Sequence, residues 1–149
     1  MKAELSVRAV HQGGMRVLAT DGQFEVLMDY PIQENESILG PTPLTMLLAS
    51  LAACSLNSVA MILKKMQQPL LGLEVKARGV RKTEHPTLLT DISLEFTVKS
   101  GVDPAAVAHA MKLSKERLCP VWNMLKSSTA IKAEFHLRPK EELEPAPAH

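Results

Sequence analysis

Hydrophobic and polar residues alternate along several short stretches of this chain, and a period of two is typical of half-buried β-strands. Turn-forming residues separate the stretches, and Asp21-Gly22, between the second and third, is a common hairpin signal. We therefore predict strands over 5–9, 15–20, 24–29, 73–80, 91–98 and 131–137. The polar segment 30–39 contains a proline and is predicted to be a loop.

The segment 42–65 has instead the length and the residue propensities of an α-helix. Thr42 suits the N-cap and Pro43 the first helical position. The segment is apolar nearly all round, and such a helix is buried within a protein or a membrane. Several small polar side chains interrupt it, so we predict a central buried helix of a globular protein and no membrane partner.

Two more helices are expected in the second half of the chain. Asp103 is a good N-cap followed by a proline, and the helix that it begins is predicted to continue to about Arg117. A short helix is predicted to begin near Cys119-Pro120. With strands that pair mostly as hairpins and helices that pack on them, the fold class is α+β. One small sheet covers only one side of the helix over 42–65, so burial alone predicts a homodimer.

Composition narrows the possible functions. The chain has 149 residues, and we predict one domain over 1–138 followed by a disordered, acidic and Pro/Ala-rich tail over 139–149. A net charge of +1 and 3% aromatic residues give no sign of a nucleic-acid partner. The N-terminus alternates instead of forming an apolar export signal, so the expected location is cytoplasmic.

Cys54 and Cys119 are the candidate reactive residues. They lie 65 residues apart, which excludes a CxxC motif, and two thiols alone make a poor zinc site. The five histidines show no ligand spacing, so no metal and no cofactor are predicted. Two interpretations stay open, because both cysteines suit a buried core and both suit a two-thiol redox centre. Cys119 precedes a helix N-terminus, where the dipole favours an anion.

Two sequence blocks resemble the OsmC/Ohr family, the osmotically inducible and organic hydroperoxide resistance proteins. The first is Gly40-Pro41-Thr42-Pro43 leading through an apolar helix to Ala52-Ala53-Cys54. The second is Leu118-Cys119-Pro120-Val121-Trp122-Asn123. The resemblance covers roughly residues 1–138 and implies antiparallel sheets packed around long buried helices in an intertwined homodimer. It also implies a peroxidase that reduces organic hydroperoxides and is restored by a small dithiol or lipoyl-type reductant.

The resemblance assigns roles to three residues. Cys54 matches the peroxidatic cysteine and Cys119 the resolving one, while Arg16 matches an arginine that favours the thiolate. In the family a glutamate after the helix-starting proline orients that arginine, and here Leu44 stands at its position. Glu34 or Glu36 could substitute for it, although a solvated loop position is the plainer interpretation of both.

Two functions therefore remain from the sequence. One is a cysteine-based hydroperoxide reductase that serves oxidative-stress defence. The alternative is a non-catalytic protein of the same fold that binds a small apolar ligand or senses thiol oxidation. The two cysteines favour the first, and Leu44 favours the second.

Overall fold

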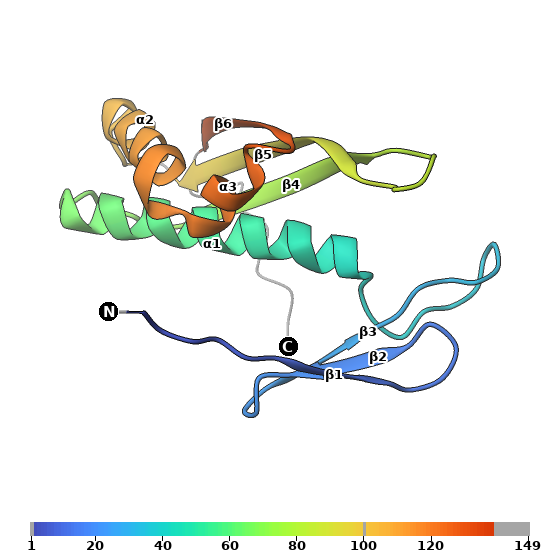
Figure 1. Ribbon diagram of the computed structural model, residues 1–149. Helices are drawn as coiled ribbons and strands as arrows, with labels where there is room; N and C mark the ends of the chain where they lie inside the picture. Colours follow the sequence, from blue (N-terminus) through green and yellow to red (C-terminus); the bar gives the residue numbers. More distant parts are fainter. Residues whose placement is uncertain (1, 100, 139–149) are drawn as a thin grey trace. The chain divides into compact units, whose positions relative to one another are not determined.

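The computed structural model describes residues 2–99 and 101–138 (Figure 1). The chain divides into two compact units, Met1–Leu47 and Leu48–His149, and each is described by itself. The predicted tail over 139–149 lies outside the described residues. A single domain over 1–138 stays a prediction.

The first unit contains a three-stranded antiparallel sheet in the order β1-β2-β3. Its strands are β1 (Arg8–His11), β2 (Val17–Thr20) and β3 (Glu25–Met28). The predicted first strand was placed too early, because Leu5 and Val7 are exposed and residues 2–7 pair with nothing in the sheet. The hairpin at Asp21-Gly22 is confirmed, with a turn of four residues in which the Asp21 carboxylate accepts two backbone N–H groups.

The segment after β3 returns along this strand without regular structure as far as α1, as predicted. The N–H of Asp29 donates to the carbonyl of Pro41 at 3.2 Å. Gly40 lies so close to the carbonyl of Leu27 that a Cβ would overlap it, so only glycine fits here. The glycine thereby fixes the end of the loop beside β3.

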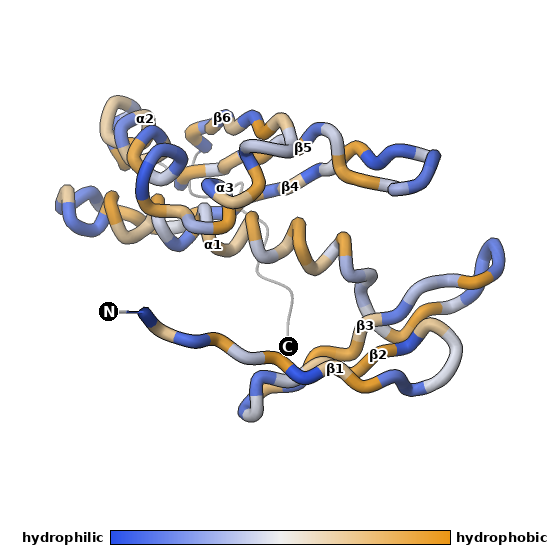
Figure 2. Tube along the Cα trace, in the orientation of Figure 1, coloured by the Kyte–Doolittle hydropathy of each residue, from blue (hydrophilic) through white to orange (hydrophobic). Residues whose placement is uncertain are grey.

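Helix α1 (Pro43–Lys65) has the predicted bounds and N-cap. The hydroxyl of Thr42 accepts the N–H of Thr45 at 3.2 Å, which satisfies one of the free donors of the first turn. The buried positions form one stripe, spaced three and four residues apart: Leu51, Ser55, Ser58, Val59, Ile62 and Leu63. Figure 2 shows the apolar character along the helix and the polar residues where it ends.

Helix α1 is the one helix among the described residues that is long and apolar enough to cross a membrane by length and composition. A core helix passes the same test, and the buried stripe of α1 packs in the protein core. Part of the helix outside this stripe remains accessible in the single chain, where Met61 is 43% exposed.

The second unit contains a sheet in the order β4-β5-β6. Strands β4 (Leu73–Arg81) and β5 (Leu89–Lys99) form an antiparallel pair. Strand β6 (Ala130–Arg138) runs parallel to β5, so the prediction of purely antiparallel sheets was wrong for this sheet. The helical connection between β5 and β6 returns the chain to the same end of the sheet, which permits parallel pairing.

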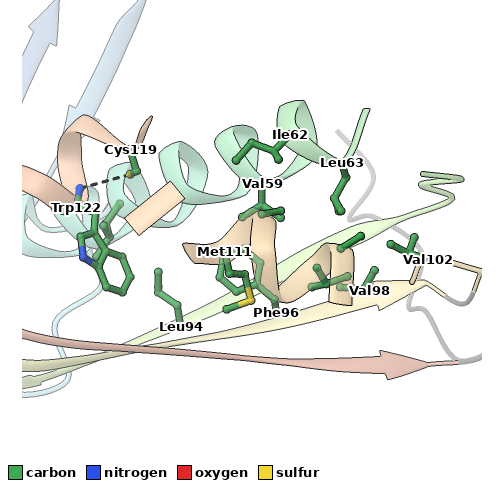
Figure 3. Packing of buried hydrophobic residues seen from close by; sticks show 14 of the residues in the cluster. Val59, Ile62, Leu63, Leu94, Phe96, Val98, Val102, Met111, Cys119 and Trp122 are labelled. Atoms are coloured by element: carbon green, nitrogen blue, oxygen red, sulfur yellow. Dashed lines mark hydrogen bonds between the residues drawn. The ribbon is translucent and has the colours of Figure 1, made fainter. Parts of the chain in front are cut away.

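Helices α1, α2 (Pro104–Leu113) and α3 (Pro120–Leu125) lie on one face of this sheet (Figure 1). Side chains from α1, β5 and α2 meet in a single cluster (Figure 3). Every second residue of β5 contributes, and Val98 and Leu94 are at most 1% exposed. The fully or nearly buried apolar residues are Leu51, Val59, Ile62, Leu63, Ile92, Leu94, Phe96, Val98, Val102, Ala106, Val107, Ala110, Met111, Cys119 and Trp122.

The helix predicted to continue to Arg117 changes its winding at Ser114. A π-helical turn, η1 (Ser114–Leu118), follows α2 directly, and the N–H of Cys119 donates to the carbonyl of Ser114 at 2.9 Å. Asp103 caps α2 as predicted, through a hydrogen bond from the N–H of Ala105. Turns of this kind are rare and occur often at functional sites. Here the turn delivers Cys119 to the start of α3.

Candidate functional site

The structure brings the two cysteines together within the second unit. Cys54 lies in the middle of α1 and is partly exposed, whereas Cys119 is the N-cap of α3 and is 0% exposed. Both are free thiols, and Cys119 lies close enough to raise the pKa of Cys54. The separation of 65 residues in sequence is thus closed by the packing of α3 against α1.

The sulfur of Cys119 is held by two neighbours. The backbone N–H of Trp122 donates to it at 3.4 Å, as the first turn of α3 requires of its cap (Figure 3). The hydroxyl of Ser55 lies 3.4 Å from the same sulfur. These contacts fix the direction in which the Cys119 thiol points.

The surroundings of Cys54 favour the neutral thiol. Burial raises the pKa of Cys54 above its ordinary value of 9.0, because removal of water disfavours the thiolate. The N–H of Val121 donates to the sulfur and opposes this rise in pKa, whereas the neighbouring Cys119 adds to it. Among the described residues, no cationic side chain contributes to this shift in the pKa of Cys54. The second unit therefore supplies proximity of the two thiols without a charge that activates Cys54.

Asn123 fastens the turn that carries Cys119. Its side-chain amide donates to the carbonyl of Lys115 at 3.1 Å and to that of Cys119 at 2.9 Å. The carbonyl of Cys119 also accepts the backbone N–H of Asn123 at 3.1 Å, so the side-chain amide adds a second bond there and ties it to the carbonyl of Lys115. The ammonium of Lys126 in turn donates to the amide oxygen of Asn123 at 2.6 Å.

A small cavity of about 10 Å³ lies next to the cysteine pair. It has room for roughly one water molecule. The lining residues are Ser55, Val59, Phe96, Met111, Ser114, Lys115, Trp122 and Ala133. Trp122 thus forms part of the wall, and the ammonium of Lys115 lies 5.8 Å from its ring centre. An apolar ligand does not fit in this space.

Arg16, the third predicted site residue, lies in the first unit and pairs with Asp29. Its Nε lies 3.5 Å from Oδ2 of this carboxylate, which is 8% exposed in its side chain. Asp29 also accepts the N–H of Leu39 at 3.1 Å and the N–H of Tyr30 at 2.9 Å. The hydrogen bond from Leu39 is the largest cause that lowers the pKa of Asp29, and Arg16 contributes to the same direction. Asp29 is therefore a fixed anion beside the guanidinium.

Neither Glu34 nor Glu36, the two suggested substitutes for the family glutamate, contacts Arg16 among the contacts of the described residues. The carboxylate of Glu36 accepts the N–H groups of Ile32 at 2.7 Å and Gln33 at 3.2 Å, so it caps its own loop. Glu34 is an exposed loop residue. Asp29 is the carboxylate that contacts Arg16, and sequence reasoning missed it. Its position at the end of β3, next to a tight loop, was the available signal.

Comparison with known proteins identifies the family. The model of the family described as OsmC-like protein matches residues 34–134, and the chain belongs to this family. Protein YhfA of Escherichia coli K12 is 35% identical over 114 residues, which cover 76% of this chain and 82% of that protein. The resemblance that the two cysteine blocks suggested is thereby confirmed.

Solved structures show the same fold. The crystal structure of an OsmC-like protein from Mycoplasma pneumoniae superposes with a TM-score of 0.81 and 23% identity, over 92% of this chain and 99% of that one. The organic hydroperoxide resistance protein OhrB of Bacillus subtilis gives a TM-score of 0.69 and 16% identity, over 90% and 98% of the two chains. The α+β class and its architecture are thus those of the OsmC-like proteins.

Proposed function

We propose that this protein is a thiol-dependent peroxidase that reduces organic hydroperoxides, with Cys54 as the peroxidatic and Cys119 as the resolving cysteine. The proximity of the two free thiols carries the proposal, since the sulfur of Cys119 lies 3.4 Å from the hydroxyl of Ser55, the residue next to Cys54. This arrangement places two oxidisable sulfurs beside each other, as disulfide formation requires. The partly exposed thiol of Cys54 can meet a substrate, whereas the buried thiol of Cys119 can meet only its neighbour.

The reaction proceeds in two balanced steps. The Cys54 thiolate attacks the O–O bond of the hydroperoxide and becomes a sulfenic acid, while the alkoxide leaves and takes up a proton as an alcohol. The Cys119 sulfur then attacks the Cys54 sulfur, and the thiol hydrogen leaves with the sulfenic hydroxyl as water. A small dithiol or lipoyl-type reductant restores both thiols and is itself oxidised to a disulfide.

Arg16 supplies the positive charge that the first step needs. Burial raises the pKa of Cys54, and a cation near the sulfur would offset this rise. In this proposal Asp29 replaces the family glutamate and holds the guanidinium in a defined direction. The residue at the family position, Leu44, then has no part in catalysis.

The protein is proposed to act as a homodimer in the cytoplasm. A second copy would cover the accessible face of α1, which carries exposed apolar side chains in the single chain. A reducing compartment keeps two adjacent thiols reduced until a peroxide arrives. Oxidative-stress defence is the role in which such a cycle serves the cell.

The test measures consumption of cumene hydroperoxide with dihydrolipoamide as reductant, for the wild type and for Cys54→Ser and Cys119→Ser. Cys54→Ser is expected to lose all activity. With one equivalent of peroxide and no reductant, Cys119→Ser is expected to stop at a sulfenic acid that a dimedone adduct reveals by mass spectrometry. Peroxide consumption by Cys54→Ser at the wild-type rate would refute the proposal.

A second candidate function is the sensing of oxidation, and it rests on the same two neighbouring free thiols. A disulfide between them would record an oxidant without a catalytic cycle. In that case the Cys54–Cys119 disulfide forms with stoichiometric oxidant, but turnover with dihydrolipoamide is absent. The same assay separates the two functions.

A further inference from the structure

Four polar residues are buried in the described chain, and three of them are serines beside the cysteine pair. Ser55 and Ser114 are 2% exposed and Ser58 is 7% exposed. A buried hydroxyl without a partner costs free energy, so its presence in a core requires an explanation. Ser55 and Ser58 come from α1, and Ser114 is the first residue of η1.

The three serines join α1 to the turn that carries Cys119. At one end of the turn, the hydroxyls of Ser58 and Ser114 lie 2.5 Å apart. At the other end, the hydroxyl of Ser55 lies 3.4 Å from the sulfur of Cys119. Ser58 also bonds the carbonyls of Cys54 at 3.1 Å and Ser55 at 3.0 Å. We call Ser55, Ser58 and Ser114 the serine seam.

The π-helical turn determines how the serine seam lines up with α1. Ser114 and Cys119 lie five residues apart, and the hydrogen bond from the N–H of Cys119 to the carbonyl of Ser114 closes one wide turn between them. Ser55 and Ser58 lie three residues apart on one face of α1. Each end of the wide turn therefore meets one hydroxyl of α1.

Packing alone does not explain this arrangement. Alanine at the three positions would fill most of the same volume and would leave no hydroxyl to satisfy. Ser55 bonds the one side-chain atom of Cys119 that reacts, and the Trp122 N–H approaches the same sulfur at the same distance. When Cys119 loses its proton, the hydroxyl of Ser55 can donate to the sulfur, because a hydroxyl serves as donor or acceptor.

We infer that Ser55 is a further catalytic residue of the disulfide-forming step, donating a hydrogen bond to the Cys119 sulfur as it attacks Cys54, and that Ser58 and Ser114 are positioning residues. The inference rests on the proposed roles of the two cysteines. It predicts that Ser55 affects the attack by Cys119 and leaves the first attack by Cys54 unchanged. Loss of Ser58 or Ser114 loosens the turn and affects the same step to a smaller extent.

Glutathione disulfide tests this without a peroxide. The Cys54 thiolate attacks one sulfur of glutathione disulfide, breaks its S–S bond and releases one glutathione, which leaves a mixed disulfide on Cys54. Cys119 then attacks the Cys54 sulfur and releases the second glutathione. Quenched samples analysed by mass spectrometry follow the mixed disulfide and the internal disulfide separately, so the two rates are measured in one experiment.

The variants are Ser55→Ala, Ser55→Thr, Ser114→Ala and, as a matched control, Ser93→Ala on the exposed side of β5. We expect Ser55→Ala to slow internal disulfide formation by about tenfold, the effect of one hydrogen bond to a charged atom, so that the mixed disulfide accumulates. Ser55→Thr keeps the hydroxyl and is expected to restore most of the rate. Ser93→Ala is expected to match the wild type in both steps.

Near-ultraviolet circular dichroism of Trp122 confirms that each variant keeps the packing around Cys119. If Ser55→Ala does not fold, Ser114→Ala carries the test, and an unchanged second step in that variant would overturn the inference. Wild-type rates in a folded Ser55→Ala, or a Ser55→Thr as slow as Ser55→Ala, would also overturn it. Failure of the wild type to form the internal disulfide would do the same. A protein with a Ser55-dependent second step but no hydroperoxide turnover would refute the peroxidase and keep the role of Ser55.

Discussion

At Cys54 two local effects act on the thiol in opposite directions. Burial in the core raises its pKa, and the N–H of Val121 at the start of α3 opposes the rise. Burial is the larger effect, so the surroundings of Cys54 within the second unit favour its neutral thiol. Reaction with peroxide at neutral pH then depends on a positive charge from elsewhere, which is the role proposed for Arg16.

Arg16→Ala tests this role at the level of one side chain. With the guanidinium removed, burial sets the pKa of Cys54, so the pH dependence of its alkylation by iodoacetamide should move to higher pH, with a midpoint above 9.0. Peroxide reduction at neutral pH should fall by roughly tenfold or more, since an opposite charge near a thiolate has effects of this size. Arg8→Ala, on the exposed strand β1, is the control and should behave as the wild type. An unchanged alkylation profile in Arg16→Ala would show that another group activates Cys54.

Asp29→Asn tests whether a carboxylate orients Arg16. The substitution removes the charge that faces the guanidinium at 3.5 Å and keeps a similar shape. We expect the alkylation profile of Cys54 to move in the same direction as in Arg16→Ala and by less. Asp21→Asn is a matched control, because Asp21 also accepts two backbone N–H groups but lies in the exposed turn after β2. Equal effects of the two substitutions would argue for a structural role of Asp29 alone.

At the scale of elements, the π-helical turn η1 decides where Cys119 lies. In a continuous α-helix from Pro104, each residue would advance about 100° round the helix axis. The wider π-helical turn advances less for each residue, so Cys119 points in a different direction from the one that an α-helix would give it. Asn123 holds the π-helical turn through the carbonyls of Lys115 and Cys119. The consecutive elements α2, η1 and α3 therefore act together to place the Cys119 thiol against α1.

Asn123→Ala is predicted to loosen the π-helical turn that holds Cys119 against α1. Removing the amide takes one donor from the carbonyl of Lys115 and one from that of Cys119, which keeps the backbone N–H of Asn123, and the free energy of unfolding should fall by about 1–3 kcal/mol in urea titration. Formation of the Cys54–Cys119 disulfide should slow as well, because Cys119 is held less firmly. Lys126→Ala removes the ammonium that contacts the amide oxygen and leaves the two carbonyl bonds intact, so it should change both quantities little. A variant of Asn123 with wild-type disulfide kinetics would contradict the proposed function of the turn.

At the scale of the whole molecule, the accessible face of α1 bears on the oligomeric state. The helix buries one stripe in the chain's own core and leaves apolar side chains such as Met61, which is 43% exposed, outside it. Burial of such surface against a second copy is favourable, at roughly 25 cal/mol for each Å² of apolar area.

Met61→Glu should therefore shift a dimer toward monomer in light scattering coupled to size exclusion. The reason is that the dimer would have to bury a carboxylate without a partner. Val80→Glu adds the same charge to an exposed apolar position on β4 and should leave the dimer intact. A wild type that is monomeric at micromolar concentration would contradict the homodimer directly.

The sequence by itself determined the elements whose signals are local. Thr42 and Pro43 set the start of α1 because cap and first-turn preferences depend on neighbouring residues, and the alternation in 73–80 and 91–98 set β4 and β5 for the same reason. The two cysteine blocks likewise indicated the family that the comparisons confirm. The tertiary structure decided what depends on contacts between distant residues. It paired β6 parallel to β5, brought Asp29 to Arg16 and aligned Ser55 with Cys119, because each of these contacts joins residues between 13 and 64 positions apart or follows from the path of a long connection.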